Sequence, residues 1–331
     1  MKTRENKGIH MNSRYGASQH GIALLLVLWV LTILMVIVMS FSFMTRTETY
    51  ATLSFKEGIE KKFLAEAGIE RAIMELFYRN HYKDQDVEID NLGIWKTDGS
   101  PYVGQLDGGS YTVKIVDESG KVDINTTSDV VLKNLFMNVG IRMEDADIIT
   151  DSIMDWKDSD DFHRLHGSES DYYMSLPNPY KAKNARFDTI EELLLVKGMT
   201  SDMLYGTAEK TGIVHFLTVN AKSTTININA APKEVLAAIP GSSPEIADGI
   251  ISYRQNKEIE NLQDVAGILG SNLNIMIPYL STEGSGVFTI DSFGHKGDAR
   301  QSYAIRATVF MSDAEDTHRY LYYKSPANIQ P

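Results

Sequence analysis

The chain has 331 residues, enough for about one to three domains with sizeable buried cores, and its 43% hydrophobic and 23% charged residues exclude an intrinsically disordered protein. The formal net charge of −12 means that the molecule as a whole repels phosphate groups, so nucleic-acid binding would need a local basic patch. The sequence has no cysteine, which excludes disulfide frameworks, thiol nucleophiles and metal centres with cysteine ligands. Stabilisation beyond packing would have to come from cations with oxygen ligands.

The N-terminal region contains an uncharged apolar segment from Ile22 to Met44, long enough to span a bilayer as a helix. Basic residues dominate the segment before it, with Glu5 as the single acid. These basic residues are Lys2, Arg4, Lys7 and Arg14. The positive-inside rule therefore predicts a single-pass membrane protein with a cytoplasmic N-terminus and the bulk of the chain periplasmic or extracellular.

Helical character continues beyond the apolar segment. From Thr47 to Phe77 the chain has no proline, and two successive runs of apolar residues each keep a spacing of four, with charged residues between them. These apolar residues are Phe55, Ile59, Phe63, Ile69, Ile73 and Phe77. We therefore predict one helix from Ile22 to about Tyr78, roughly 85 Å long at 1.5 Å per residue. A conventional cleavable signal is disfavoured because no small-residue cleavage site follows so long an apolar core.

A short basic leader ending in Gly21, followed by a hydrophobic helix, resembles the N-terminus of pilins and pseudopilins. The resemblance implies a leader of residues 1–21, cleavage by a prepilin peptidase between Gly21 and Ile22, and N-methylation of Ile22. Most members of these families carry glutamate at the fifth mature position, where this chain has Leu26. That glutamate neutralises the amino terminus of the subunit above it, because an unpaired charge in an apolar bundle is costly. A subunit with Leu26 is expected at the tip, as in the family it resembles, minor pseudopilin K of the type II secretion system.

Four segments have the pattern of strands. The residues of Tyr111–Asp117 alternate between apolar and polar, as in a half-buried strand. Three further segments, separated by polar turns, are Val287–Phe293, Ser302–Met311 and His318–Lys324. We predict an α+β, pilin-like fold in which these strands form a small antiparallel sheet packed on the long helix. The head would comprise residues 79–121 and 284–331, interrupted by a helical domain over residues 122–283, as in pseudopilin K.

The predicted insertion contains a weak internal repeat, because Ile124–Leu132 resembles Ile228–Leu236. These pieces, and the capped helix start at Phe187–Gly198, resemble helix-hairpin-helix or SAM-like units. A glycine hairpin at Ile239–Pro244 could offer backbone N–H groups to a phosphate. Residues 228–263, however, contain more acidic than basic side chains, which disfavours DNA binding. A membrane-anchored DNA-binding protein of this class remains an alternative interpretation.

An acidic segment with many potential oxygen ligands runs from Asp151 to Tyr173. Clustered carboxylates of this kind suit calcium, although the spacing is not that of an EF-hand and a solvated acidic loop is the alternative. The segment resembles pseudopilin K in an Asp-Trp-x-Asp-x-Asp-Asp run followed by Gly-x-Glu, and that family is associated with calcium. The resemblance implies a calcium cofactor. The candidate ligands are Asp155, Asp158, Asp160, Asp161 and Glu169.

The resemblance covers nearly the whole chain and implies a structural protein rather than an enzyme. It implies a minor pseudopilin that caps the pseudopilus and helps to export folded proteins across the outer membrane. Its implied partners are the other minor pseudopilins and the major pseudopilin, the prepilin peptidase, the inner-membrane assembly platform, and the secretin or secreted substrates, with no nucleic acid. No Gly-x-Ser-x-Gly, His-Glu-x-x-His or phosphate-loop motif occurs in the sequence. A minor pilin of a type IV pilus is an alternative that shares the helix but does not need the insertion.

Overall fold

The computed structural model describes residues 19–82, 95–297, 302–312 and 317–329. The chain divides into two units, Met1–Glu60 and Lys61–Pro331, which are described separately. Most of the predicted leader, residues 1–18, lies outside the described residues.

Helix α1 comprises Gln19–Tyr82, so it begins earlier and continues further than the predicted range of residues 22–78. Neither the His20–Gly21 pair nor the sequence after residue 78 interrupts the helix, and its last turn carries Arg79 and His81, which favour a helix C-terminus. Within the first unit its apolar side chains are exposed. Among the described residues, α1 is the one helix long and apolar enough to cross a membrane, with a mean hydropathy of 3.2 in its most apolar window.

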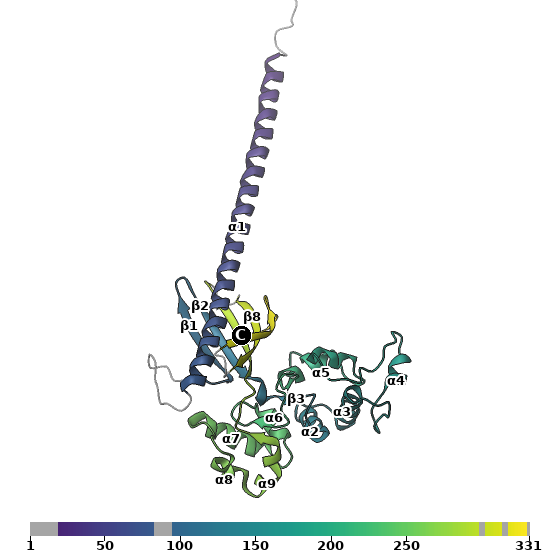
Figure 1. The fold of residues 1–331 in the computed structure, drawn as a ribbon. Helices are drawn as coiled ribbons and strands as arrows, with labels where there is room; N and C mark the ends of the chain where they lie inside the picture. The colour runs from purple at the N-terminus through teal and green to yellow at the C-terminus, as the bar shows by residue number, and fades with distance from the viewer. Residues whose placement is uncertain (1–18, 83–94, 298–301, 313–316, 330–331) are drawn as a thin grey trace, which may run out of the picture. The chain divides into compact units, whose positions relative to one another are not determined.

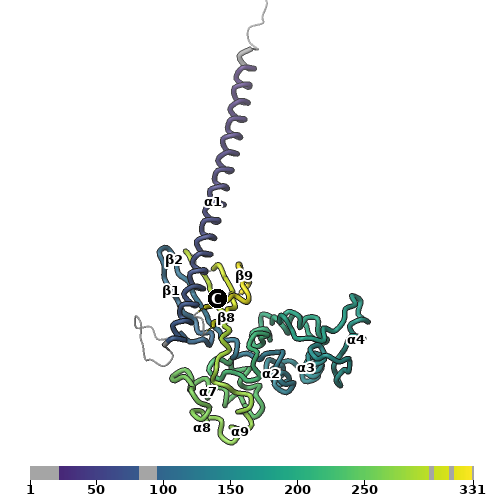
Figure 2. The backbone as a smooth tube through the Cα atoms, in the orientation of Figure 1, coloured from purple at the N-terminus to yellow at the C-terminus, as the bar shows by residue number. Residues whose placement is uncertain are grey.

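The second unit contains an antiparallel five-stranded sheet in the order β1-β2-β7-β8-β9 (Figures 1 and 2). Its strands are β1 (Asp98–Leu106), β2 (Gly109–Asp117), β7 (Val287–His295), β8 (Tyr303–Ser312) and β9 (Thr317–Lys324). The four predicted strands are present with nearly the predicted bounds. Strand β1 was not predicted, because Gly99, Pro101 and Gly104 are unfavourable in a strand. They are tolerated here because β1 is an edge strand with an irregular register near Pro101.

The part of α1 within the second unit packs against this sheet (Figure 1). Its buried face includes small residues, which allow the helix to approach the strands closely, and Gly294 of β7 has no room for a Cβ beside the backbone of α1. The helix residues in this core are Ala65, Ile69, Ala72, Ile73 and Leu76. Phe55 and Phe63 of the apolar row lie outside this core, because they are 70% and 62% exposed.

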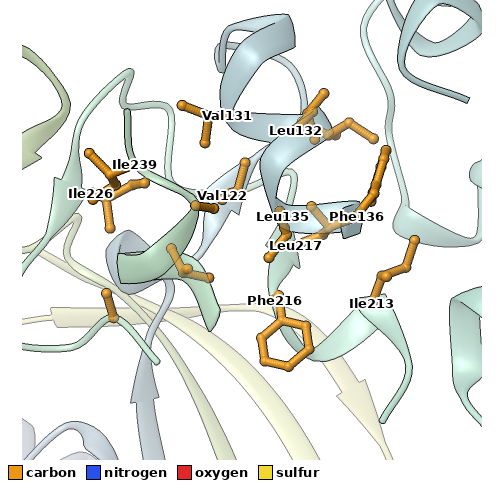
Figure 3. Close-up of a cluster of buried hydrophobic side chains, with 14 of the residues drawn as sticks. Val122, Val131, Leu132, Leu135, Phe136, Ile213, Phe216, Leu217, Ile226 and Ile239 are labelled. Carbon is orange, nitrogen blue, oxygen red and sulfur yellow. The ribbon is translucent and has the colours of Figure 1, made fainter. Parts of the chain in front are cut away.

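Between β2 and β7 the chain forms a helical insertion with its own hydrophobic core. The α-helices are α2 (Asp129–Asn138), α3 (Met143–Lys157), α4 (Ser170–Met174), α5 (Ser201–Tyr205), α6 (Lys233–Ala238), α7 (Pro244–Asn256), α8 (Ala266–Leu269) and α9 (Leu273–Met276). The 3₁₀ helices are η1 (Glu118–Gly120), η2 (Ile190–Leu195), η3 (Ile213–His215), η4 (Leu262–Val265), η5 (Gly270–Asn272) and η6 (Ile277–Tyr279). Figure 3 shows Leu132, Leu135 and Phe136 of α2 among apolar side chains from other segments of the insertion.

The predicted internal repeat has a structural counterpart. In the first copy β3 (Val122–Asp123) pairs in parallel with β4 (Leu217–Thr218), and in the second β5 (Ile226–Asn227) pairs in parallel with β6 (Leu280–Ser281). In both copies the side chain of the last strand residue accepts a hydrogen bond from the backbone two residues later, at 2.9 Å in the first copy and 3.0 Å in the second. The same turn thus leads into α2 in one copy and into α6 in the other.

A buried polar cluster joins the sheet to the insertion. Glu118 is 3% exposed, forms an ion pair with Lys121 at 2.6 Å and accepts a hydrogen bond from Thr289 of β7 at 2.8 Å. It also accepts a hydrogen bond from Thr218 of the insertion. Burial acts to raise the pKa of Glu118, but the ion pair with Lys121 and the hydrogen bonds outweigh it and hold the pKa below its ordinary value. The carboxylate is therefore charged and bonded to both parts of the second unit.

Candidate functional site

The acidic segment forms the connection between α3 and α4 and brings three carboxylates together. Ligand atoms of Asp158, Asp160 and Glu169 all lie within 4.8 Å of one another. Asp158 is the C-cap residue of α3 and Glu169 is the N-cap residue of α4, where its side chain makes no capping hydrogen bond. The C-terminal end of α3 and the N-terminal end of α4 therefore hold two members of the cluster. The carboxylate of Glu169 does not cap its own helix.

Glu169 is the most unusual member of the cluster. Glu169 is 2% exposed, and neither of its carboxylate oxygens has a hydrogen-bond partner among the described residues. The same holds for Oδ1 of Asp158. Burial, followed by the negative charges of Asp155 and Asp158, raises the pKa of Glu169 to about 7. A buried carboxylate without partners is costly unless a proton or a cation neutralises it.

Two of the five predicted ligands lie outside this cluster and have other partners, and Asp160 within it accepts a hydrogen bond from the backbone N–H of Phe162 at 2.9 Å. Asp155 is fully buried, and its carboxylate accepts hydrogen bonds from the backbone N–H of Arg164 at 3.0 and 3.2 Å. Asp161 accepts a hydrogen bond from Nδ2 of Asn184 at 3.2 Å. Gly167 has no room for a Cβ beside the carboxylate of Asp155, so this loop packs tightly on α3. The structure thus brings Asp158, Asp160 and Glu169 together and uses Asp155 and Asp161 to hold the surrounding loop.

Asn184 is a residue of this region that sequence reasoning missed. It has a positive φ of 47°, and its Nδ2 donates to the backbone oxygen of Asp160 at 3.2 Å as well as to Asp161. Its own Oδ1 is buried and has no hydrogen-bond partner among the described residues. A neutral oxygen of this kind is a suitable calcium ligand. The sequence contains no signal for it except an asparagine in a polar stretch beyond the acidic segment.

Aromatic side chains form the apolar surroundings of the acidic connection. Trp156 and Tyr173 are buried, with ring centroids 5.2 Å apart in an edge-to-face arrangement. Tyr180 lies 5.3 Å from Tyr173, and Phe187 lies 6.4 Å from Trp156. These rings exclude water from one side of the loop, which contributes to the raised pKa values of Asp155 and Glu169.

The donor set fits a hard divalent cation. It consists of carboxylate oxygens, with an amide oxygen nearby, and calcium accepts six to eight ligands of this type. The unpartnered oxygens of Glu169 and Asp158 are the observation that supports the fit, because a cation would satisfy them. Asp158, Asp160 and Glu169 are the residues that would hold it.

Without a divalent cation, we expect the protein to lose heat stability as the pH rises from about 5 to about 8. The pKa of Glu169 is raised from 4.5 to about 7, so its contribution to stability is fully present below pH 4.5 and is lost as the pH rises through 7. The raised pKa values of Asp155 and Asp158 act in the same direction. Melting temperatures measured in chelator across this range test the expectation, and a Glu169→Gln variant should show a flatter pH dependence. A rise in stability with pH would contradict it.

The glycine hairpin of the second repeat lies between α6 and α7. Gly241 has a φ of +84°, and Ser243 caps α7. The nearby basic side chains have structural partners, since Lys233 pairs with Asp248 at 2.7 Å and Arg254 donates to two backbone oxygens at 2.8 Å. This arrangement offers a phosphate little positive charge.

Comparisons with known proteins show where this architecture belongs. A family model described as "Type II secretion system (T2SS), protein K" matches residues 113–206, from within β2 to the hairpin after α5, and includes the acidic connection. A type II secretion system protein K of Pectobacterium carotovorum subsp. carotovorum is 31% identical over 113 residues, 30% of this chain and 34% of the relative. Over the matched residues the chain is similar to the type II secretion system protein K family. This similarity and the α+β fold class agree with the sequence-based predictions.

Other comparisons cover more of this chain. A family model for the helix-hairpin-helix motif matches residues 221–280, the second repeat. The protein K of Pseudomonas aeruginosa is 26% identical over 187 residues, 53% of this chain and 54% of the relative. The chain thus aligns with between 34% and 54% of the length of these two curated relatives.

A solved structure shows the same fold at low sequence identity. It is "The Crystal Structure of the GspK-GspI-GspJ complex from enterotoxigenic Escherichia coli Type 2 Secretion System". The matched chain has a TM-score of 0.59 and 16% identity, and the alignment covers 85% of this chain and all of that chain. At this identity the likeness shows a shared fold and no more.

Proposed function

We propose that this chain is a type II secretion system protein K, a minor pseudopilin at the tip of the pseudopilus, anchored in the inner membrane with its head in the periplasm. The observation that carries the proposal is a pilin-like sheet interrupted, between β2 and β7, by an insertion whose first part, up to residue 206, the protein K family model matches. Its role is mechanical: it caps the filament and supports the export of folded proteins. Its partners are other minor pseudopilins, by analogy with the complex that contains the structural relative, together with the major pseudopilin, the assembly platform, and the secretin or secreted substrates.

Leu26 supports the position at the tip. If the mature chain begins at Ile22, its fifth residue is an apolar side chain that cannot neutralise the amino terminus of a subunit above. The amino group of Ile22 can still pair with a glutamate of the subunit below. A subunit with these two properties fits best where nothing is added above it, and the insertion gives the head extra bulk in the same place.

The processing step offers a direct test. In cells that also produce a prepilin peptidase, we expect cleavage between Gly21 and Ile22 and a methyl group on the new N-terminus. Intact-mass measurement of the purified chain should show a mature N-terminus at Ile22, whereas a Gly21→Leu variant should keep residue 1. An uncut wild-type chain, or cleavage beyond Met44, would contradict the assignment to the pseudopilins.

We further propose that the acidic connection binds calcium. The ion would neutralise Asp158, Asp160 and Glu169 and tie the C-terminus of α3 to the N-terminus of α4. Its contribution would be structural, because it would remove the cost of the buried, unpartnered carboxylate of Glu169. The rigid connection would then present the same surface to the partners of the pseudopilus.

A further inference from the structure

The acidic connection between α3 and α4 also carries two large apolar side chains that point into solvent. Phe162 is 84% exposed and Leu165 is 88% exposed, whereas Leu24, the most exposed large apolar residue of the membrane-spanning helix, reaches 73%. Side chains this exposed gain nothing from the fold of the chain itself, and neighbouring exposed apolar residues are typical of interfaces. We call Phe162 and Leu165 the exposed apolar pair.

Hydrogen bonds fix the backbone that carries the exposed apolar pair. The carboxylate of Asp155, which is fully buried, accepts hydrogen bonds from the backbone N–H of Arg164 at 3.0 and 3.2 Å. Asp151 accepts a hydrogen bond from the backbone N–H of His166 at 3.0 Å, and Nζ of Lys197 donates to the backbone oxygen of the same histidine at 3.4 Å. The loop is therefore held on both sides of its exposed leucine, and a loop ordered in this way loses little conformational entropy on binding.

Arg164 places a positive charge between the two members of the exposed apolar pair. Its side chain is 45% exposed, and its guanidinium group lies 3.7 Å from carboxylate oxygens of Asp129 and Asp155. An ion pair of this length and exposure is weak, so the guanidinium group is available to another acid. Burial lowers the pKa of Lys157 to about 8, and the nearby charges of Arg164 and Arg186 act in the same direction. Three cationic side chains thus lie close together beside the pair.

The surroundings of the loop favour a folded protein over a lipid surface as its partner. Figure 1 shows α4 on the side of the insertion away from the five-stranded sheet, so the connection that precedes α4 is open to a partner there. Asp160 and Asp161 of the same loop are exposed, and anionic headgroups would repel their carboxylates. A fixed loop with an aromatic and an aliphatic side chain instead suits a preformed apolar pocket.

We propose that the exposed apolar pair inserts into an apolar pocket with an acidic rim on a protein outside the pseudopilus, the secretin. The proposal rests on the function proposed above. Phe162 and Leu165 fill the pocket, and Arg164 pairs with its rim, in keeping with the aromatic and arginine side chains that dominate the centres of interfaces. A loop with one fixed conformation suits a partner whose surface is always the same. Secreted proteins differ from one another in their surfaces, so the secretin is the better match among the proposed partners.

The cysteine-free sequence allows a crosslinking test that leaves the exposed apolar pair intact. His163→Cys places a cysteine-directed photo-crosslinker between the two members in the full-length protein, in envelope membranes that contain the secretin and the other components of its own secretion system. The matched control is Met143→Cys, a 58% exposed position at the other end of α3, about 21 Å along the helix. We expect crosslinks from His163→Cys to the periplasmic part of the secretin, located by mass spectrometry, at about tenfold the yield from the control.

Removing the pair tests whether its side chains make the contact. Phe162→Asn and Leu165→Asn, added together to His163→Cys, should lower the crosslink yield about tenfold, because truncation of the central side chains of an interface removes much of the binding energy. The same two substitutions should leave the melting temperature of the protein unchanged, because both side chains are exposed in the free chain. A loss of crosslinking at an unchanged melting temperature therefore reports binding and not folding.

The outcomes separate this proposal from the proposed function. Crosslinks to lipid or to a secreted protein instead of the secretin overturn it, as does a yield that Phe162→Asn and Leu165→Asn do not change. If the unmodified protein copurifies with other minor pseudopilins but His163→Cys crosslinks no better than Met143→Cys, the pair is not a docking site and the proposed function stands. If the unmodified protein copurifies with no other component and gives no crosslink, both proposals fail.

Discussion

Replacing Glu169 by glutamine should abolish the stabilisation of this protein by calcium. At a calcium concentration about a thousandfold above the dissociation constant, binding to the folded state stabilises it by about 4 kcal/mol, which raises the melting temperature of a unit of this size by about 8 to 16 °C. Glu169 is the buried member of the proposed site, and its oxygens have no hydrogen-bond partner among the described residues. Glutamine has nearly the same shape as glutamate but lacks the negative charge that attracts the cation. Melting curves of the full-length chain in detergent, with calcium and with chelator, measure the effect.

The same substitution should act in the opposite direction without calcium. At pH 8 the wild-type carboxylate is buried and charged, because the pKa of Glu169 is about 7, and glutamine relieves that cost. The variant should then be at least as stable as the wild type in chelator. Glu209→Gln, which changes an exposed carboxylate outside the cluster, should leave the calcium response unchanged. A full calcium response in Glu169→Gln, or none in the wild type, would contradict the proposed site.

Much of the fold could be predicted from the sequence, because most of its strands alternate between apolar and polar residues. Tyr111–Asp117 was predicted as a strand and forms most of β2, since Tyr111, Val113 and Ile115 belong to the core against α1. Strand β1 lacked this pattern because an edge strand needs no continuous buried face. The small residues in the core face of α1 could not be recognised from the apolar pattern. Close helix packing uses small residues such as Ala65 and Ala72, whereas the large residue Phe63 remains outside the core.

The candidate site could be predicted only in part. Residue type and resemblance identified the five acids, but they could not distinguish an acid that bonds the loop backbone from one without a partner. Asp155 belongs to the first kind and Glu169 to the second. Asn184 approaches from a separate segment, and its position depends on a left-handed backbone conformation that the sequence did not reveal. Spacing along the chain locates a cluster of ligands, whereas tertiary contacts decide which members are available.

Replacing Lys121 by methionine should cost about 3 to 5 kcal/mol, because it leaves the carboxylate of Glu118 buried without its counter-charge. Glu118 is 3% exposed, and the Lys121 side chain is 14% exposed. A surface pair provides the matched control: Lys233→Met breaks the ion pair with Asp248, whose side chains are 45% and 57% exposed, and should cost less than about 1 kcal/mol. Denaturant unfolding of the full-length chain in detergent compares the two variants.

The pH dependence identifies the cause of the loss. In the wild type the pKa of Glu118 is held below 4.5, so its contribution is present above that pH and is lost on acidification. In Lys121→Met the ion pair no longer opposes burial, and burial then raises the pKa of Glu118. The stability lost relative to the wild type should therefore shrink as the pH falls towards 5. Adding Glu118→Gln to Lys121→Met should recover most of the stability, since no buried charge remains. Equal losses in Lys121→Met and Lys233→Met, or a deficit independent of pH, would show that the ion pair does not hold the insertion to the sheet.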